Sequence, residues 1–415
     1  RAWTDALLRL DRDARAIEYD NLPPGARDQL RAEVRRTGLP DAAPAALTEG
    51  CGATLRDRDL ATPGARARLR AAAVVPDDYQ TWKRVAGLYA LTRIPFARGV
   101  RTYEDSVRAV YATPPDTLPV LGRLVRYAPR QAADDASSAA ELARRVARAG
   151  ASFEAPAAQD VERLLAFYAP VFEVDEALPE DRIGTVRLDA SGAPVIDTSA
   201  ARVYGRVAYT RVGGRVLAQA VYTAWFPGRP KTSAFDMLGG RFDAVVWRAT
   251  LEHDGTVAVF DTMHACGCYH MFFPTPRAAA RPRPETLDEW AFVPQTLPSI
   301  APGQPVRLRI AARSHYLVRV LPDSAAAADA AEPRSYALDA ETALRSLPAP
   351  DGTRRSLYGP DGIVAGSERG ERYLFWPMGI EEPGAMRQWG RHATAFVGRR
   401  HFDDADLLPR YFVLE

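Results

Sequence analysis

The chain has 415 residues, of which 47% are hydrophobic and 26% are charged, and its formal net charge is +2 at pH 7. This length and apolar content predict a folded protein with a sizeable core and exclude a disordered chain. Arginines alternate with Asp and Glu along the sequence. Because a nucleic-acid groove needs clustered cations with stacking aromatics, we expect no nucleic acid among the partners.

No window reaches the roughly 18 consecutive apolar residues that a membrane-spanning helix needs, so we expect no transmembrane segment in this chain. The sequence begins at Arg1 rather than Met. From this we expect a processed chain, which leaves room for a signal peptide or a lipid anchor upstream. The odd number of cysteines leaves at least one thiol outside any intramolecular disulfide.

Residues 1–168 have the pattern of a mainly helical region. Residues 4–20 and 23–40 are charged and rich in Ala, Leu and Arg, and residues 161–168 carry an apolar stripe at i, i+3, i+4 and i+7. Residues 87–100 (GLYALTRIPFARGV) are apolar around a central proline. We interpret them as a buried connector; the alternative is a surface for a lipid or a partner.

In residues 169–335 the period becomes strand-like. Two runs of β-branched and aromatic residues flank Gly213-Gly214, and two more flank Asp254-Gly255, which predicts two β-hairpins. Residues 306–321 add a further strand-like run. Consecutive strands with short turns predict an antiparallel sheet, sandwich or open barrel.

Residues 336–415 are mixed, with a short helix expected at residues 339–347 and a strand-like pattern at residues 388–407. We therefore predict an α+β fold in which a helical N-terminal region packs on an antiparallel β-sheet or sandwich. The C-terminal segment is expected to complete that sheet and the functional site.

The segment FDTMHACGCYHMFFP (residues 260–274) carries the main candidate site, since His264, Cys266, Cys268 and His270 occupy every second position. In a straight strand these side chains share one face, with the two histidines roughly 20 Å apart. Zinc–ligand bonds of about 2 Å cannot close four such positions onto one ion. A straight strand could offer one neighbouring pair of ligands, such as Cys266 and Cys268 or Cys268 and His270, with the others supplied from elsewhere. A bend at Gly267 could instead gather three of the four.

Two further histidines, His392 and His401, lie in the strand-like C-terminal segment with Asp403, Asp404 and Asp406 nearby. A sheet that placed this segment beside the cysteines would assemble a Cys/His metal site. Zinc is the ion best suited to mixed thiolate and imidazole ligands, with copper as the second choice. The predicted metal ligands are His264, Cys266, Cys268, His270, His392 and His401.

Four other interpretations of the cysteines remain open. Cys266 and Cys268 could form a thiol redox pair, or either could form a disulfide with Cys51. Cys268 could be a nucleophile activated by His270. Both cysteines could also be inert, small apolar residues on a strand face.

The motifs CGCYHMFFPT, VYTAWFPGRP, RYLFWPMGI and GAMRQWGRHATAFVGRRHFDD resemble an uncharacterised family of proteobacterial envelope proteins, many of them described as lipoproteins. The resemblance runs from about Asp59 onward. It implies a location in the periplasm or cell envelope, and it brings no activity, substrate or cofactor. An oxidising location would favour a disulfide from Cys51.

From these observations we predict a bacterial cell-envelope protein with a Cys/His metal site. A zinc-dependent hydrolase is the first functional hypothesis, with zinc-bound water as nucleophile and Asp403 or Asp404 as base or as orienting carboxylate. The alternatives are a non-catalytic binding or scaffold protein with a disulfide from Cys51 to Cys266 or Cys268, and a Cys-Gly-Cys redox protein.

Overall fold

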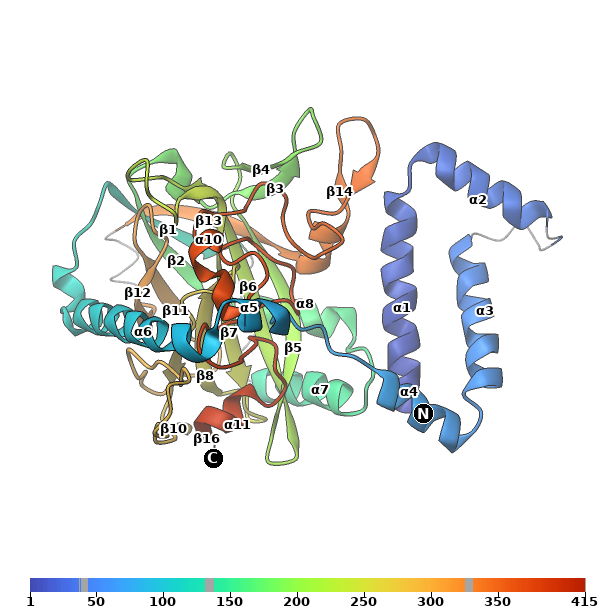
Figure 1. Ribbon diagram of the computed structural model, residues 1–415, viewed down its shortest axis with the longest axis horizontal. Coiled ribbons are helices and arrows are strands. Elements are labelled where there is room, and N and C mark those ends of the chain that lie inside the picture. The colour runs from blue at the N-terminus through green and yellow to red at the C-terminus, as the bar shows by residue number, and fades with distance from the viewer. Residues whose placement is uncertain (37, 39–43, 131–137, 325–330, 415) are drawn as a thin grey trace.

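The computed structural model describes residues 1–36, 38, 44–130, 138–324 and 331–414, and in this part of the chain a mixed sheet of ten strands forms the centre (Figure 1). The strand order is β12-β11-β2-β1-β13-β5-β6-β7-β8-β9. In chain order these strands are β1 (Arg123–Pro129), β2 (Val171–Glu176), β5 (Arg202–Val212), β6 (Arg215–Arg229), β7 (Gly240–Leu251), β8 (Val257–His264), β9 (Met271–Pro274), β11 (Val306–Ile310), β12 (Leu317–Pro322) and β13 (Glu332–Ala340). The predicted α+β class is confirmed.

Strands β5 to β9 form an antiparallel meander, and both predicted hairpins are present in it. Gly213 and Gly214 make the β5–β6 turn with φ of 53° and 81°, a conformation that favours glycine. The whole sheet is mixed rather than antiparallel, because β1 pairs with β13, β11 with β2 and β13 with β5 in parallel. The segment boundaries at 168 and 335 stay a prediction.

Different layers cover the two faces of the sheet. Helices α7 (Ala139–Ala151) and α8 (Ala158–Phe167) pack on β5 and β6 on one face, where Leu164 and Leu165 of the predicted stripe are buried. On the other face, residues such as Trp225 and Val246 pack against Leu344, Met386 and Phe402 of the C-terminal segment. The core is therefore closed by chain that is mostly irregular.

The C-terminal segment contributes only β13 to the large sheet. The rest consists of short elements joined by loops: η4 (Glu341–Arg345), β14 (Leu347–Pro348), β15 (Arg354–Arg355), α10 (Arg372–Phe375), η5 (Trp376–Met378), α11 (Leu407–Tyr411) and β16 (Phe412–Leu414). The strand predicted for residues 388–407 is wrong, since only one isolated bridge, Ala393 to His401, occurs there. Three small two-stranded sheets, with two to four residue pairs each, complete the β structure. They pair β3 (Thr185–Leu188) with β4 (Pro194–Asp197), β10 (Ala278–Ala280) with β16, and β14 with β15.

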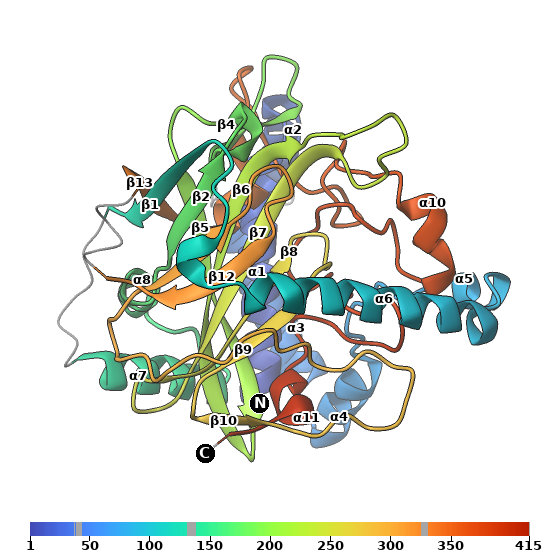
Figure 2. The same ribbon diagram turned by 90° about the vertical axis from the view of Figure 1, so that its left-hand side faces the viewer.

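Helix α6 (Tyr89–Ala112), preceded by α5 (Thr81–Ala86), lies across the edge strands of the sheet (Figure 2). The Tyr111 hydroxyl donates to the Leu317 carbonyl of β12 at 2.9 Å, and its ring lies 6.0 Å from that of Phe273 in β9. One residue thus contacts both edges of the sheet, which is curved around this end of the helix. The 3₁₀ turns η1 (Pro115–Thr117) and η3 (Pro179–Asp181) lie in the connections that follow.

The interpretation of residues 87–100 as a buried connector is wrong. They form the start of α6, and Leu88, Leu91 and Ile94 are 64%, 66% and 54% exposed. These exposed side chains are compatible with the alternative interpretation, a surface for a lipid or a partner, which stays a prediction.

The N-terminal helices stand beside the sheet rather than in its core (Figure 1). They are α1 (Ala2–Asn21), α2 (Pro24–Arg36), α3 (Pro44–Asp59) and α4 (Pro63–Ala72). None of the buried hydrophobic clusters in the described residues contains a side chain that precedes Tyr79. Arg9 and Asn21 of α1 do donate hydrogen bonds, to the Phe153 and Arg345 carbonyls at 2.9 Å each.

A chain that begins at Val74 is therefore expected to fold like the whole protein. Losing a few exposed hydrogen bonds should change the free energy of unfolding by less than about 2 kcal/mol in urea denaturation. A chain that begins at Gln80 is the matched control, because it also loses Asp78, whose buried carboxylate lies 3.2 Å from Arg387. Removing one partner of such a pair should cost about 3–5 kcal/mol. Equal stabilities of the two truncated proteins would contradict the expectation that Asp78 stabilises the fold whereas the residues before Val74 do not.

Candidate functional site

The Cys-Gly-Cys segment is the loop between β8 and β9 and not a strand. Its backbone folds back on itself, with His264 N–H donating to the Cys268 carbonyl at 2.9 Å and Gly267 N–H to the His264 carbonyl at 2.8 Å. Gly267 has φ of 92°, and Tyr269 is also left-handed at 62°. A bend at Gly267, one of the alternatives that the sequence leaves open, is therefore present, together with a strained aromatic residue of the kind found at functional sites.

Gly267 also lies directly against the C-terminal segment. A Cβ atom added to it would overlap the carbonyl oxygen of Ala393. On the other side of this contact, the His392 ring lies 3.1 Å from the Ala265 carbonyl through Nε2. The C-terminal segment thus lies beside the cysteine loop, as expected, but the two meet through backbone atoms and not through metal ligands.

The histidines of the cysteine segment are engaged with buried carboxylates. His264 Nδ1 lies 3.1 Å from Asp243, and His270 Nε2 lies 3.0 Å from Asp261, which Arg248 also binds. Burial lowers the pKa of His270 to about 4, and burial lowers that of His392 to about 3. Both rings are therefore neutral at pH 7 and serve as hydrogen-bonding parts of the core.

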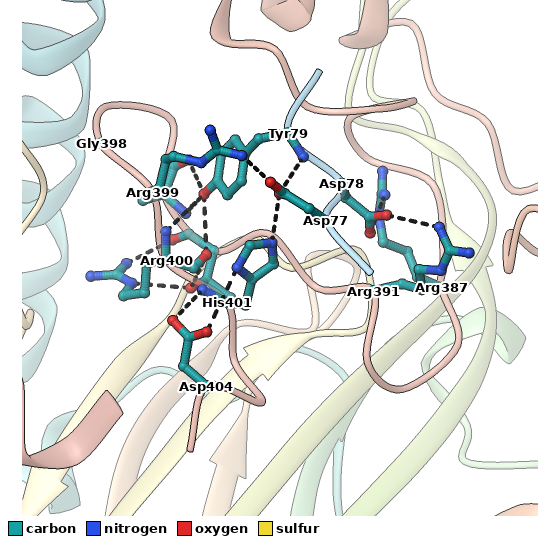
Figure 3. Close-up of polar contacts among 12 residues, drawn as sticks. Asp77, Asp78, Tyr79, Arg387, Arg391, Gly398, Arg399, Arg400, His401 and Asp404 are labelled. Atoms are coloured by element: carbon teal, nitrogen blue, oxygen red, sulfur yellow. Dashed lines mark hydrogen bonds and ion pairs between the residues drawn. The ribbon is translucent and has the colours of Figure 1, made fainter. Parts of the chain in front are cut away.

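His401 belongs to a separate cluster that attaches residues 77–79 to the C-terminal segment (Figure 3). Its Nε2 lies 3.2 Å from Asp77, and its backbone N–H donates to Asp404 at 3.2 Å. The Tyr79 hydroxyl donates to the Ala395 carbonyl at 2.7 Å, and its ring meets the edge of His401. Asp404 is thus used in a structural contact.

The predicted Cys/His metal site is wrong. Within the described residues, no three His, Cys, Asp or Glu side chains are grouped so that they could hold a metal ion. The physical reason is that each candidate histidine points to its own carboxylate or carbonyl partner rather than toward the thiols. The zinc or copper ion and the zinc-dependent hydrolase hypothesis rested on that grouping and lose their basis.

The predicted disulfide is also wrong, because Cys51, Cys266 and Cys268 are all free thiols. Cys51 is exposed on α3, a helix that packs against α1 and stands apart from the sheet (Figure 1). The Cys266 thiol is hydrogen-bonded to Cys268, and this contact together with burial raises the pKa of Cys268 well above its usual range. Since the thiolate is the reactive form, the raised pKa makes Cys268 a poor nucleophile at neutral pH.

The cysteine loop lines a cavity of about 640 Å³ between α6 and the C-terminal segment. The walls are mainly apolar and aromatic, and they come from segments far apart in the sequence. Helix α6 contributes Pro95, Phe96, Gly99, Val100 and Tyr103; the β8–β9 loop contributes Cys266, Cys268 and Tyr269; the following chain contributes Trp290, Phe292 and Tyr316; and the C-terminal segment contributes Leu374, Phe375, Ile380, Pro383, Gly384 and Phe396.

Glu371 is the carboxylate of this cavity that lacks a partner. Its side chain is 3% exposed and lines the cavity, yet no hydrogen bond or ion pair within the described chain reaches its oxygens. Burial raises the pKa of Glu371 from 4.5 to about 7, against the opposing effect of Arg369 and Arg229. Both cations are committed elsewhere, Arg369 at 3.4 Å from Asp243 and Arg229 at 3.2 Å from the Tyr316 hydroxyl.

The other carboxylates of the cavity are paired. Glu289 accepts the Phe396 and Val397 N–H groups at 2.6 and 3.0 Å and lies 3.6 Å from Arg400. Glu104 lies 3.4 Å from Arg108. With Arg400 balancing Glu289, the remaining charge that faces the cavity is that of Glu371.

The sequence pointed to the cysteine loop and His270 as metal ligands, but it did not identify Glu371, helix α6 or the aromatic walls of the cavity. Glu371 stands in SERGERYLFWPMG, where Glu368 and Arg369 resemble any charged surface turn. The aromatic residues Tyr373, Phe375 and Trp376 follow it, and a carboxylate directly before such a run was the available signal.

No protein-family model, no curated protein and no solved structure matches the chain. The resemblance to an envelope family therefore stays a prediction, and so does the periplasmic or envelope location. The function has to be inferred from the cavity itself.

The pKa of Glu371 predicts the pH dependence of stability. A carboxyl whose pKa is raised on folding destabilises the folded state above that pKa and ceases to do so below its ordinary value. Between pH 4.5 and 7, the free energy of unfolding of Glu371→Gln should therefore rise relative to the wild type by about 3 kcal/mol. Urea denaturation across this range measures the difference. The exposed neighbour Glu368→Gln is the control, and a flat difference for Glu371→Gln would contradict the assignment.

Proposed function

We propose that this protein binds an apolar small molecule that carries one cationic or hydrogen-bond-donating group. The observation that carries the proposal is the apolar cavity of about 640 Å³ into which a single unpaired carboxylate, Glu371, projects. Cavities of roughly 300–1,000 Å³ with apolar walls and few convergent polar groups are the usual form of small-molecule sites.

The walls favour a long or aromatic apolar body. Phe96, Phe375 and Phe396 pack together, with ring centroids 5.6 Å apart for the first pair and 4.8 Å apart for the last pair. Burying apolar ligand surface against such rings contributes roughly 25 cal/mol for each Å² removed from water. The two cysteines extend this surface, since a free cysteine behaves as a small apolar residue.

The unpaired carboxylate selects the polar group of the ligand. An ammonium or a hydroxyl can donate to Glu371, whereas a carboxylate ligand would meet a like charge in a site of low polarity. A cation would also offset the cost of keeping Glu371 buried and would lower its pKa. We therefore infer that alkyl or aromatic amines are preferred over alcohols, and alcohols over carboxylates.

Filling the cavity should abolish binding without harming the fold. Gly99 lies within α6 and lines the cavity, and a Cβ atom there meets no neighbour within 4 Å. Gly99→Leu should stabilise the helix by up to about 1 kcal/mol. It should also weaken the fluorescence-detected binding of the neutral probe N-phenyl-1-naphthylamine by at least about tenfold, equivalent to 1.4 kcal/mol. Ala109→Leu, on an exposed part of the same helix, is the matched control. Unchanged probe binding by Gly99→Leu would contradict the cavity as the site.

Displacement of that probe tests the role of Glu371. For decylamine, decanol and decanoate, the wild type is expected to bind the amine most tightly and the carboxylate least. Glu371→Gln should lower the preference for amine over alcohol by about tenfold, because a hydrogen bond to a charged group contributes roughly 1.5–3 kcal/mol. Probe affinity itself should change little. If the wild type and Glu371→Gln preferred the amine over the alcohol to the same degree, Glu371 would not determine the ligand selectivity.

A further inference from the structure

A large apolar surface lies beside the cavity, and no part of the described chain covers it. We call it the α5–α10 surface. It consists of Trp82, Val85, Leu88, Leu91, Ile94, Tyr373, Leu374 and Trp376, each at least 37% exposed. Single exposed apolar residues are ordinary, but a contiguous group of this size marks an interaction site.

The residues of this surface are neighbours in space. Helices α5 and α6 both contact η5, which directly follows α10, and Figure 2 shows the three helices together at one side of the molecule. Gly87, between α5 and α6, lies so close to Pro377 of η5 that a Cβ atom would overlap it. The surface is therefore one face built from two distant parts of the chain.

The α5–α10 surface is continuous with the cavity. Leu374 is 50% exposed and also lines the cavity, and so do the exposed residues Pro95 and Gly99 of α6. These three residues mark the opening of the cavity at the edge of the surface. An apolar molecule that passes between the surface and the cavity thus stays in contact with apolar side chains.

The charges on the α5 and α6 part of the surface are positive. From Thr81 to Thr102 the chain has five cations and no carboxylate: Lys83, Arg84, Arg93, Arg98 and Arg101. Arg84 and Arg93 are engaged with the Met378 carbonyl and with Asp288, but Lys83, Arg98 and Arg101 have no ion-pair partner in the described chain. Exposed apolar residues that include Trp and Tyr, together with cations that lack an ion-pair partner in the described chain, suit the surface of an anionic bilayer.

We propose that the α5–α10 surface docks the protein on an anionic lipid bilayer and that the cavity exchanges its apolar ligand with that bilayer through the opening at Pro95, Gly99 and Leu374. The docking is an attachment to the surface, since no helix among the described residues is long and apolar enough to span a membrane. The exchange of ligand rests on the proposed function, whereas the docking does not.

Sedimentation with vesicles tests the docking. The full-length protein is expected to sediment with vesicles of equal parts phosphatidylglycerol and phosphatidylcholine. Leu91→Glu, which puts a charge at the centre of the surface, should lower the partition coefficient at least tenfold. Leu121→Glu is the matched control, because Leu121 is 48% exposed in the loop before β1 and lies outside the surface. It should bind vesicles like the wild type.

The free cations provide an independent variant. Replacing Lys83, Arg98 and Arg101 by Ala should lower binding to anionic vesicles by roughly fivefold for each cation removed, the equivalent of about 1 kcal/mol each. Binding to vesicles of phosphatidylcholine alone should be weak for both proteins. High salt should weaken the wild type toward the triple variant.

Three results would overturn the docking proposal: a wild type that does not sediment with anionic vesicles, a Leu91→Glu variant that partitions like the wild type, or a wild-type dimer that Leu91→Glu dissociates without any vesicle binding.

N-phenyl-1-naphthylamine binding in the absence of vesicles separates the two proposals. It should be unchanged in Leu91→Glu, so that loss of docking with intact probe binding leaves the cavity site standing. If the wild type did not bind the probe, the proposed function would be contradicted. Sedimentation alone would then decide the docking proposal.

Discussion

The close contact between Gly267 and the carbonyl of Ala393 is the constraint that shapes the site. A residue with a Cβ atom could not approach this carbonyl, and it would also be strained at φ of 92°. Because the backbones meet here, the β8–β9 loop can bend back and the C-terminal segment can close over it. The cavity lies between this closed segment and α6, with the thiols on one wall.

The second constraint is the burial of charged groups near the loop. Asp243 is fully buried and lies within 3.1 Å of both His264 and His315, while Asp261 is held by Arg248 and His270. Buried carboxylates need such partners, and removing one would be costly. The histidines that made the sequence look like a metal site thus supply hydrogen bonds to the core. The spacing of these histidines is compatible both with metal binding and with hydrogen bonding in the core. The partners that decide between the two come from other parts of the chain, so the spacing cannot distinguish them.

Local patterns in the sequence predict part of this structure, and contacts between distant segments decide the rest. The hairpins at Gly213-Gly214 and Asp254-Gly255 and the buried stripe of α8 follow from local patterns, and the structure has them. The pairing of Asp243 with His264, the position of Glu371 in the cavity and the exposure of α6 depend on contacts between distant segments. Residues 87–100 illustrate this well: an apolar run predicts burial, but Leu88, Leu91 and Ile94 are exposed because the described chain does not cover their side of the helix.

Glu371 gives the strongest reason to regard the cavity as a binding site rather than a packing defect. A buried carboxyl with a pKa near 7 lowers the free energy of unfolding when it is ionised, and a glutamine or an ion-pair partner would remove that cost. Glu289, on the same cavity, has both backbone donors and Arg400, so the fold is able to satisfy a carboxylate there. Among the described residues, Glu371 is the one carboxylate of the cavity without a donor, so a partner from outside the chain would remove this cost. A cationic or donor group on an apolar ligand fills this role, and the apolar opening beside Leu374 provides its route of entry.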